Sequence, residues 1–142
     1  MQNPYSRYRK SQIETTPKLK LIVMLHDGAI RFLQQSIPAM VSEDYEMKGL
    51  MINKAINILF HLTGTLDYAN GGDLAVNICR TNQYLTQLLV EANFHNDPDR
   101  INEVIGHLRE LREAWCTVAK GIEADNPKNP PVEKKHDFSL AA

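Results

Sequence analysis

Apolar residues recur at alternating steps of three and four along most of this chain, and no segment of four or more residues alternates like a β-strand. A period near 3.6 residues is typical of amphipathic helices. Four segments carry this period, and their apolar residues repeat every seven positions, as in bundled helices that cross at about 20°. The clearest ladder comes last: Ile101, Val104, Leu108, Leu111, Trp115, Val118 and Ile122. Short connections make successive helices antiparallel, so we expect an all-α, antiparallel four-helix bundle.

Capping residues predict where these helices begin and end. Thr16-Pro17 supplies a cap and a first helical position for the first helix, and Asp97-Pro98 does the same for the fourth. Asp44 can cap the second helix, which we expect to end at Asn70-Gly71-Gly72 because glycine readily adopts the left-handed conformation. Pro38 lies inside the first ladder and predicts a kink or an early end there.

Two segments flank the predicted bundle of residues 16–124. Residues 1–15 form an N-terminal arm in which Tyr5, Tyr8 and Ile13 are the candidate anchors. Residues 125–142 contain Pro127, Pro130 and Pro131, which exclude a continuous helix, so we expect a flexible Pro-rich tail. We expect this tail to be inert; the alternative is that Phe138 and Leu140 mimic a partner and occupy its site.

Composition narrows the class of protein. The chain of 142 residues is the size of one domain, and it has no run of about 18 apolar residues that could span a membrane. Its N-terminus lacks the features of a secretory signal, so we expect a cytoplasmic protein without membrane insertion. A net charge of −1 gives no general attraction to nucleic acid. Cys79 and Cys116 have no CxxC spacing and suit reduced thiols.

No arrangement of residues predicts a catalytic site, a metal or a cofactor. The nearest approach to a metal-binding pattern is Glu91 with His95 and Glu103 with His107, at a spacing of four, and we interpret these as a solvated rim. His26 occupies a core position in the first ladder and is interpreted as a hydrogen-bonded core residue. We therefore expect a protein that is not an enzyme.

Four glycines inside the predicted helices are unusual. Gly28, Gly49, Gly64 and Gly106 each cost about 1 kcal/mol relative to alanine in a helix interior. Either the helices pack closely at these points or something outside the bundle approaches the backbone. For Gly28 we favour close packing within the bundle.

Several motifs occur together and in one order. They are Asn3-Pro4-Tyr5, Tyr8, Ile13-Glu14-Thr15, the stretch from Leu21 to Phe32, Lys54-Ala55, Asn57-Ile58, Leu66-Asp67-Tyr68 with Gly71-Gly72, Asn77-Ile78, Tyr84, Glu91-Ala92-Asn93 with Asp97, and the stretch from Leu108 to Trp115. In this order the chain resembles the flagellar secretion chaperone family, FliS, over residues 3–120. The family commonly has tyrosine where His26 stands and leucine-tyrosine where Thr81-Asn82 stand.

The resemblance implies a function in flagellar export. The family binds the C-terminal segment of flagellin, which is largely disordered in the monomer, prevents premature polymerisation and keeps flagellin competent for type III secretion. The implied recognition places short helices of the partner in apolar grooves and couples their folding to binding. The flagellar export apparatus is a further candidate partner, and the chaperone itself is a monomer or a homodimer. The rival interpretations are a generic helical adaptor or homodimeric bundle for another amphipathic client, and a metal-binding bundle.

Carried over by position, the partner-binding site involves helices two and three, with helix four as the opposite wall. The expected contacts are Ile56, Asn57, Leu74, Asn77, Ile78, Tyr84, Leu85 and Leu88. The amides of Asn57 and Asn77 can bond to an irregular partner backbone. Tyr5, Tyr8 and Ile13 are expected to cover part of the groove in the empty state and to move when the partner binds.

Overall fold

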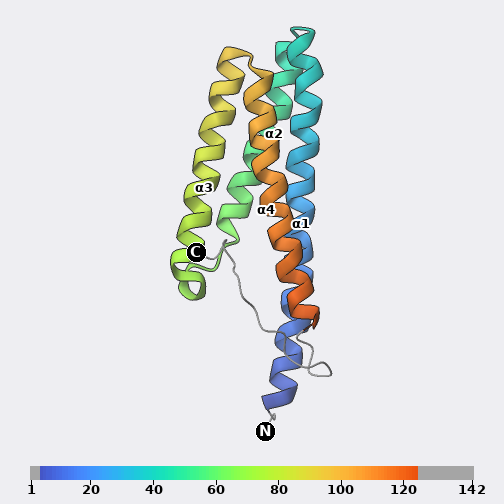
Figure 1. Cartoon of the computed structure of the whole chain (residues 1–142), viewed down its shortest axis with the longest axis vertical. Helices are drawn as coiled ribbons and strands as arrows, with labels where there is room; N and C mark the ends of the chain where they lie inside the picture. Colours follow the sequence, from blue (N-terminus) through green and yellow to red (C-terminus); the bar gives the residue numbers. More distant parts are fainter. Residues whose placement is uncertain (1–3, 125–142) are drawn as a thin grey trace.

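The computed structural model describes the backbone of residues 4–124 and the side chains of residues 17–121. Four helices run up and down in turn: α1 (Pro4–Val41), α2 (Tyr45–Gly64), α3 (Tyr68–His95) and α4 (Pro98–Ala124) (Figure 1). Within this part of the chain there is no strand. The predicted all-α, four-helix bundle is confirmed.

The four helices form a ring in which α1 and α3 lie opposite each other. α1 packs extensively along α2 and α4, whereas α3 packs along the same two helices over far fewer positions. Large side chains from every helix fill the centre, among them Leu33, Ile52, Leu85 and Leu108, each with no more than 1% of its surface exposed. α3 is therefore the least tightly held member of the bundle.

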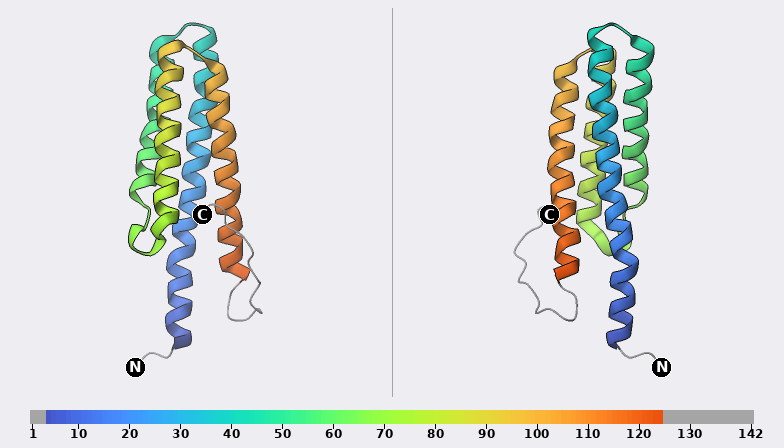
Figure 2. Two further views of the ribbon diagram at one scale, coloured as in Figure 1. Left: turned by 60° about the vertical axis from the view of Figure 1, so that its left-hand side comes forward. Right: turned by 90° about the vertical axis from the view of Figure 1, so that its right-hand side faces the viewer.

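α1 is longer than the ladder predicted. It begins at Pro4 and continues through Pro17 and Pro38, so the expected start at Thr16-Pro17 is wrong. A proline costs the helix one hydrogen bond, because it lacks an N–H, but a helix can continue past that point. Figure 2 shows the first turns of α1 extending beyond the ends of the other helices. Whether residues 1–15 act as a separate arm stays a prediction, and the tail of residues 125–142 lies outside the described residues.

The connection between α1 and α2 follows the predicted cap. The Asp44 carboxylate accepts a hydrogen bond from the Met47 amide at 3.1 Å. Glu43 takes a positive φ of 58°, and the Asp44 amide donates to the Ala39 carbonyl at 2.8 Å. These contacts satisfy backbone groups that both helix ends leave free.

The end of α2 was predicted too late. α2 ends at Gly64, and Asp67 caps α3 by accepting hydrogen bonds from the Asn70 amide at 3.1 Å and from its side chain at 2.7 Å. These hydrogen bonds also lower the pKa of the Asp67 carboxyl. Gly72 does adopt the positive φ expected of a helix stop, at 51°, but it kinks the first turns of α3. The start of α3 therefore follows the Asp67 cap and not the glycine pair.

The last connection matches its prediction. α4 begins at Pro98, and the Asp97 carboxylate accepts from the Asp99 amide at 3.0 Å. Asn96 adopts the left-handed conformation that ends α3, and its side-chain amide donates to the Met40 carbonyl at 3.2 Å. This hydrogen bond links the α3–α4 connection to the C-terminal end of α1.

Candidate partner-binding site

The two sides of α3 are fixed by a small number of polar contacts. Towards α4, the Tyr84 ring meets the His107 ring edge-on, with centroids 6.4 Å apart, and Glu91 forms an ion pair with Arg100 at 2.7 Å. These groups are largely accessible to water, where such contacts add little stability. The α3–α4 seam, which we define as the line along which these two helices face each other, is therefore weakly closed.

Towards α2, two buried side chains make the contacts. The Asn82 amide donates to the Thr63 hydroxyl at 3.2 Å, and the Lys48 ammonium donates to the Asn93 carbonyl at 2.8 Å. Both Asn82 and Lys48 are almost fully buried. A buried hydrogen bond to a charged group contributes more than a neutral one, so Lys48 is the stronger attachment of α3 to α2.

A small apolar cavity, with a volume of about 10 Å³, lies between the helices. All four helices and the α2–α3 connection contribute to its lining: Ile22, His26, Leu62, Thr65, Leu66, Ile78, Asn82, Leu111 and Trp115. We call it the α3 cavity. Leu111 and Trp115 pack against the core but are only partly buried. The cavity therefore presents apolar surface that the bundle itself leaves incompletely covered.

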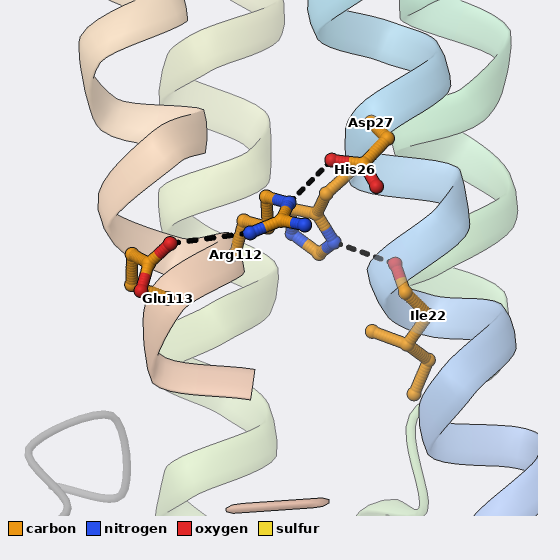
Figure 3. A network of polar contacts seen from close by, with 5 residues as sticks. All are labelled: Ile22, His26, Asp27, Arg112 and Glu113. Carbon is orange, nitrogen blue, oxygen red and sulfur yellow. Dashed lines mark hydrogen bonds and ion pairs between the residues drawn. The ribbon is translucent and has the colours of Figure 1, made fainter. Parts of the chain in front are cut away.

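His26 is the most buried polar group of the α3 cavity, with 3% of its surface exposed. Its Nδ1 lies 2.8 Å from the Ile22 carbonyl oxygen, which can only accept, so Nδ1 carries the hydrogen of the neutral ring (Figure 3). Burial lowers the pKa of His26, and the nearby Arg112 acts in the same direction, although the Ile22 carbonyl and Asp27 oppose it. At neutral pH the ring is uncharged, and Nε2 is left as a hydrogen-bond acceptor.

Next to His26, a charged pair joins the adjacent helices α1 and α4. The Arg112 guanidinium of α4 donates to the Asp27 carboxylate of α1, and its second arm reaches Glu113 at 3.1 Å (Figure 3). The hydrogen bond to Asp27 raises the pKa of Arg112. This pair holds α1 against α4 beside the cavity.

The structure brings most of the predicted α3 residues onto one side of that helix. Successive residues of an α-helix are turned by roughly 100°, which places Leu74, Asn77, Tyr84 and Leu88 on the side that faces α4. Leu74, Asn77 and Leu88 are half-buried and Tyr84 is exposed. These four residues lie along the α3–α4 seam.

The remaining predicted residues are placed differently. Ile78 and Leu85 belong to the core, with 6% and 0% of their surface exposed, so a partner contacts them only if α3 moves. Ile56 is half-buried against the core, and Asn57 is exposed on α2, away from the α3–α4 seam. Tyr5, Tyr8 and Ile13 lie in the first turns of α1, and their side chains are outside the described residues. The binding role of all these residues stays a prediction.

The ladders place His26, Leu111 and Trp115 at inward-facing positions, in agreement with the structure, but they do not indicate that the three residues line one cavity. Asn82 was noticed only as a departure from the resembled family. The available signal was a polar residue at a core position of one helix facing a histidine at a core position of another. Two such positions at one level of a bundle indicate a place where apolar packing is incomplete.

Among the described residues, Glu91, His95, Glu103 and His107 of the rival metal-binding interpretation do not gather into one group. Glu91 pairs with Arg100, and the nearest contact of Glu103 with His107 is 3.9 Å. Among the side chains that the structure describes, no three of His, Cys, Asp or Glu are grouped so as to hold a metal ion. In the same part of the chain, no helix combines the length and the hydropathy needed to cross a membrane.

Known proteins are similar in sequence to this chain over nearly all of the bundle. Residues 1–122 match the family described as flagellar protein FliS. The flagellar secretion chaperone FliS of Campylobacter jejuni is 38% identical over 120 residues, covering 83% of this chain and 94% of the relative. That of Bacillus subtilis is 31% identical over 125 residues, covering 88% and 92%. That of Vibrio cholerae is 32% identical over 122 residues, covering 83% and 90%.

Proposed function

Because the chain belongs to the FliS family of flagellar secretion chaperones, we propose that it captures the disordered C-terminal segment of flagellin in the cytoplasm before export. Its relatives are named chaperones, and the family is not one of enzymes. In this proposal the bound segment is kept from polymerising and stays competent for type III secretion. The flagellar export apparatus would receive the complex.

The observation that carries the proposal is the combination of a weakly held α3 with an apolar cavity beside it. A segment that folds on binding needs a large apolar interface to offset several kcal/mol of ordering. Leu74 and Leu88 along the α3–α4 seam, with Leu111 and Trp115 in the α3 cavity, are half-buried and supply part of such a surface. A small movement of α3 would add Ile78 and Leu85 to it.

The half-exposed Tyr84 offers a direct test. It has 52% of its surface exposed and contacts the core little, so Tyr84→Ser should leave the fold intact. Met24 is a matched control, since it is 66% exposed on α1, the helix opposite α3. Burying a large side chain contributes about 1.5–3 kcal/mol, or roughly tenfold to a hundredfold in affinity.

The experiment is a calorimetric titration of the protein with the isolated C-terminal segment of flagellin from its own organism, at several temperatures. We expect saturable one-to-one binding, a negative heat-capacity change, and weaker binding by Tyr84→Ser than by Met24→Ser. Equal weakening by the two variants would move the site away from α3. Equal affinity for an unrelated amphipathic peptide would favour a generic helical adaptor, and no binding at all would refute the proposal.

A further inference from the structure

Gly72 divides α3 into two parts that do not share one axis. Its backbone has a φ of 51° and a ψ of −126°, values that interrupt the helix between the turn of residues 68–71 and the long part that follows. Glycine adopts such a conformation without strain. Figure 1 shows the first residues of α3 turning away at the lower end of that helix. A bend of this kind acts as a hinge unless other contacts fix its angle.

Thr63, in the last turn of α2, forms hydrogen bonds with both parts of α3. Its carbonyl oxygen accepts from the Tyr68 hydroxyl at 3.1 Å, before the bend. Its hydroxyl oxygen accepts from the Asn82 side-chain amide at 3.2 Å, after the bend. The same hydroxyl donates to the Leu59 carbonyl at 3.0 Å, so α2 itself fixes its orientation. One residue of α2 therefore positions two segments of α3 at once.

Tyr68 also reaches across the bend within α3. Cys79 follows Tyr68 by eleven residues, which would place it about 16 Å further along an unbroken α-helix, beyond the reach of a tyrosine side chain. In this structure a hydrogen bond with the Cys79 side chain, aided by burial, raises the pKa of Tyr68. The bend brings these two residues together, and their contact in turn opposes straightening of the helix.

The other contacts of α3 leave the position of its first turns to these bonds. α3 packs along α2 and α4 over far fewer positions than α1 does. At the opposite end of α3, the Lys48 ammonium of α2 donates to the Asn93 carbonyl at 2.8 Å. Loss of the contacts with Thr63 would therefore free the start of α3 to swing about its far end.

We propose that Thr63, Tyr68 and Asn82 form a clasp that fixes the bend in α3 and holds the start of this helix against α2. The clasp opposes the movement of α3 that uncovers Ile78 and Leu85. It is a property of the bundle alone, whereas its effect on flagellin binding rests on the proposed function.

Two variants each remove one hydroxyl of the clasp and nearly keep the size of the side chain. Tyr68→Phe deletes the hydrogen bond before the bend, and Thr63→Val deletes the one after it. Hydrogen exchange measured by NMR follows the Gly71 amide, which donates to the Asp67 carbonyl at 2.7 Å, before the bend and the amides of residues 76–82 after it. Because both segments are tied to one residue, each variant should speed exchange on both sides by about two- to tenfold, as expected for one lost hydrogen bond.

Tyr45→Phe is the matched control. It removes the same hydroxyl from a tyrosine of α2 that is 56% exposed, and it keeps the ring that faces the Lys48 ammonium. Exchange in α3 should not change in this variant, and an unchanged helix content by circular dichroism checks the fold of all three variants. Unchanged exchange in the clasp variants, acceleration confined to the side of the deleted bond, or equal acceleration in the control would overturn the proposal.

A second step measures the affinity for the flagellin segment. Thr63→Val should bind it two- to tenfold more tightly than Tyr45→Phe, because α3 then moves more easily; unchanged or weaker binding would refute this effect of the clasp. If exchange responds as expected but the parent protein does not bind flagellin, only the proposed function fails. If the parent binds flagellin but exchange does not respond, only the clasp fails.

Discussion

Gly106 offers a quantitative test of the packing of α4. A Cβ atom at this position would have no heavy atom within 4 Å, so a methyl group meets no obstacle. Glycine in a helix interior is about 1 kcal/mol less favourable than alanine, mainly because the unfolded chain has more freedom to lose. Gly106→Ala should therefore raise the free energy of unfolding by about 1 kcal/mol, which for a domain of this size is roughly 4 °C in Tm.

The same chemical change at Gly72 should have the opposite sign. A Cβ there would also meet nothing within 4 Å, but the backbone has a φ of 51° and a ψ of −126°. A residue with a side chain is strained in such a conformation by about 1–3 kcal/mol. Gly72→Ala should therefore lower the free energy of unfolding, and the difference between the two variants isolates backbone conformation from packing.

Urea denaturation followed by far-ultraviolet circular dichroism measures both variants against the parent. The reasoning requires equal m-values, a higher midpoint for Gly106→Ala and a lower midpoint for Gly72→Ala. A loss of stability in Gly106→Ala would show that the added methyl group meets a neighbour that the described bundle does not contain. A gain in Gly72→Ala would refute the kink in α3.

Three further predictions concern the interior. Because burial lowers the pKa of His26, the unfolded chain binds a proton at a pH where the folded protein does not, so stability should fall as the pH drops below about 6.5, by at most about 1.4 kcal/mol per unit. His26→Gln, measured by urea denaturation between pH 7 and pH 5 in the presence of the unchanged Asp27 and Arg112, should flatten this slope; an unchanged slope would assign it to other groups. Lys48→Met keeps the buried stem but loses the hydrogen bond to the α3 carbonyl, so the free energy of unfolding should fall by about 1–2 kcal/mol. Amide hydrogen exchange at the end of α3 should become faster. Unchanged exchange would contradict the attachment of α3 through Lys48. Leu89→Ala removes a fully buried side chain and should cost about 2–5 kcal/mol in thermal denaturation, while a cost below 1 kcal/mol would contradict the register of α3.

Periodicity predicts the fold, because the apolar stripe of each helix must be buried. A ring of four helices is the simplest arrangement that buries all four stripes. Local capping then decided the boundaries, and here sequence reasoning succeeded where one cap stood alone, at Asp44 and at Asp97-Pro98. It failed where two signals competed. Asp67 caps α3 before the glycine pair can end α2, and Pro17 does not stop a helix that has already formed.

The candidate site was harder to predict than the fold. A ladder identifies which residues point inward, but it does not say how closely two helices approach, and this distance decides whether Leu88 is core or binding surface. The sparse packing of α3 and the cavity beside Trp115 depend on how all four helices are placed, and no single residue predicts that placement. The packed structure separates the core residues of α3 from its accessible ones, and the ladder alone does not.

The arrangement of the four helices also has a consequence for how the protein is made. α1 has its most extensive contacts with α2 and α4, the helices nearest to and furthest from it along the chain. During synthesis α1 and α2 can associate early, but the surface of α1 that belongs to α4 stays uncovered until α4 has left the ribosome. A nascent chain that stalls before α4 emerges would therefore display an apolar face of its own, and this protein would itself need protection until its last helix arrives.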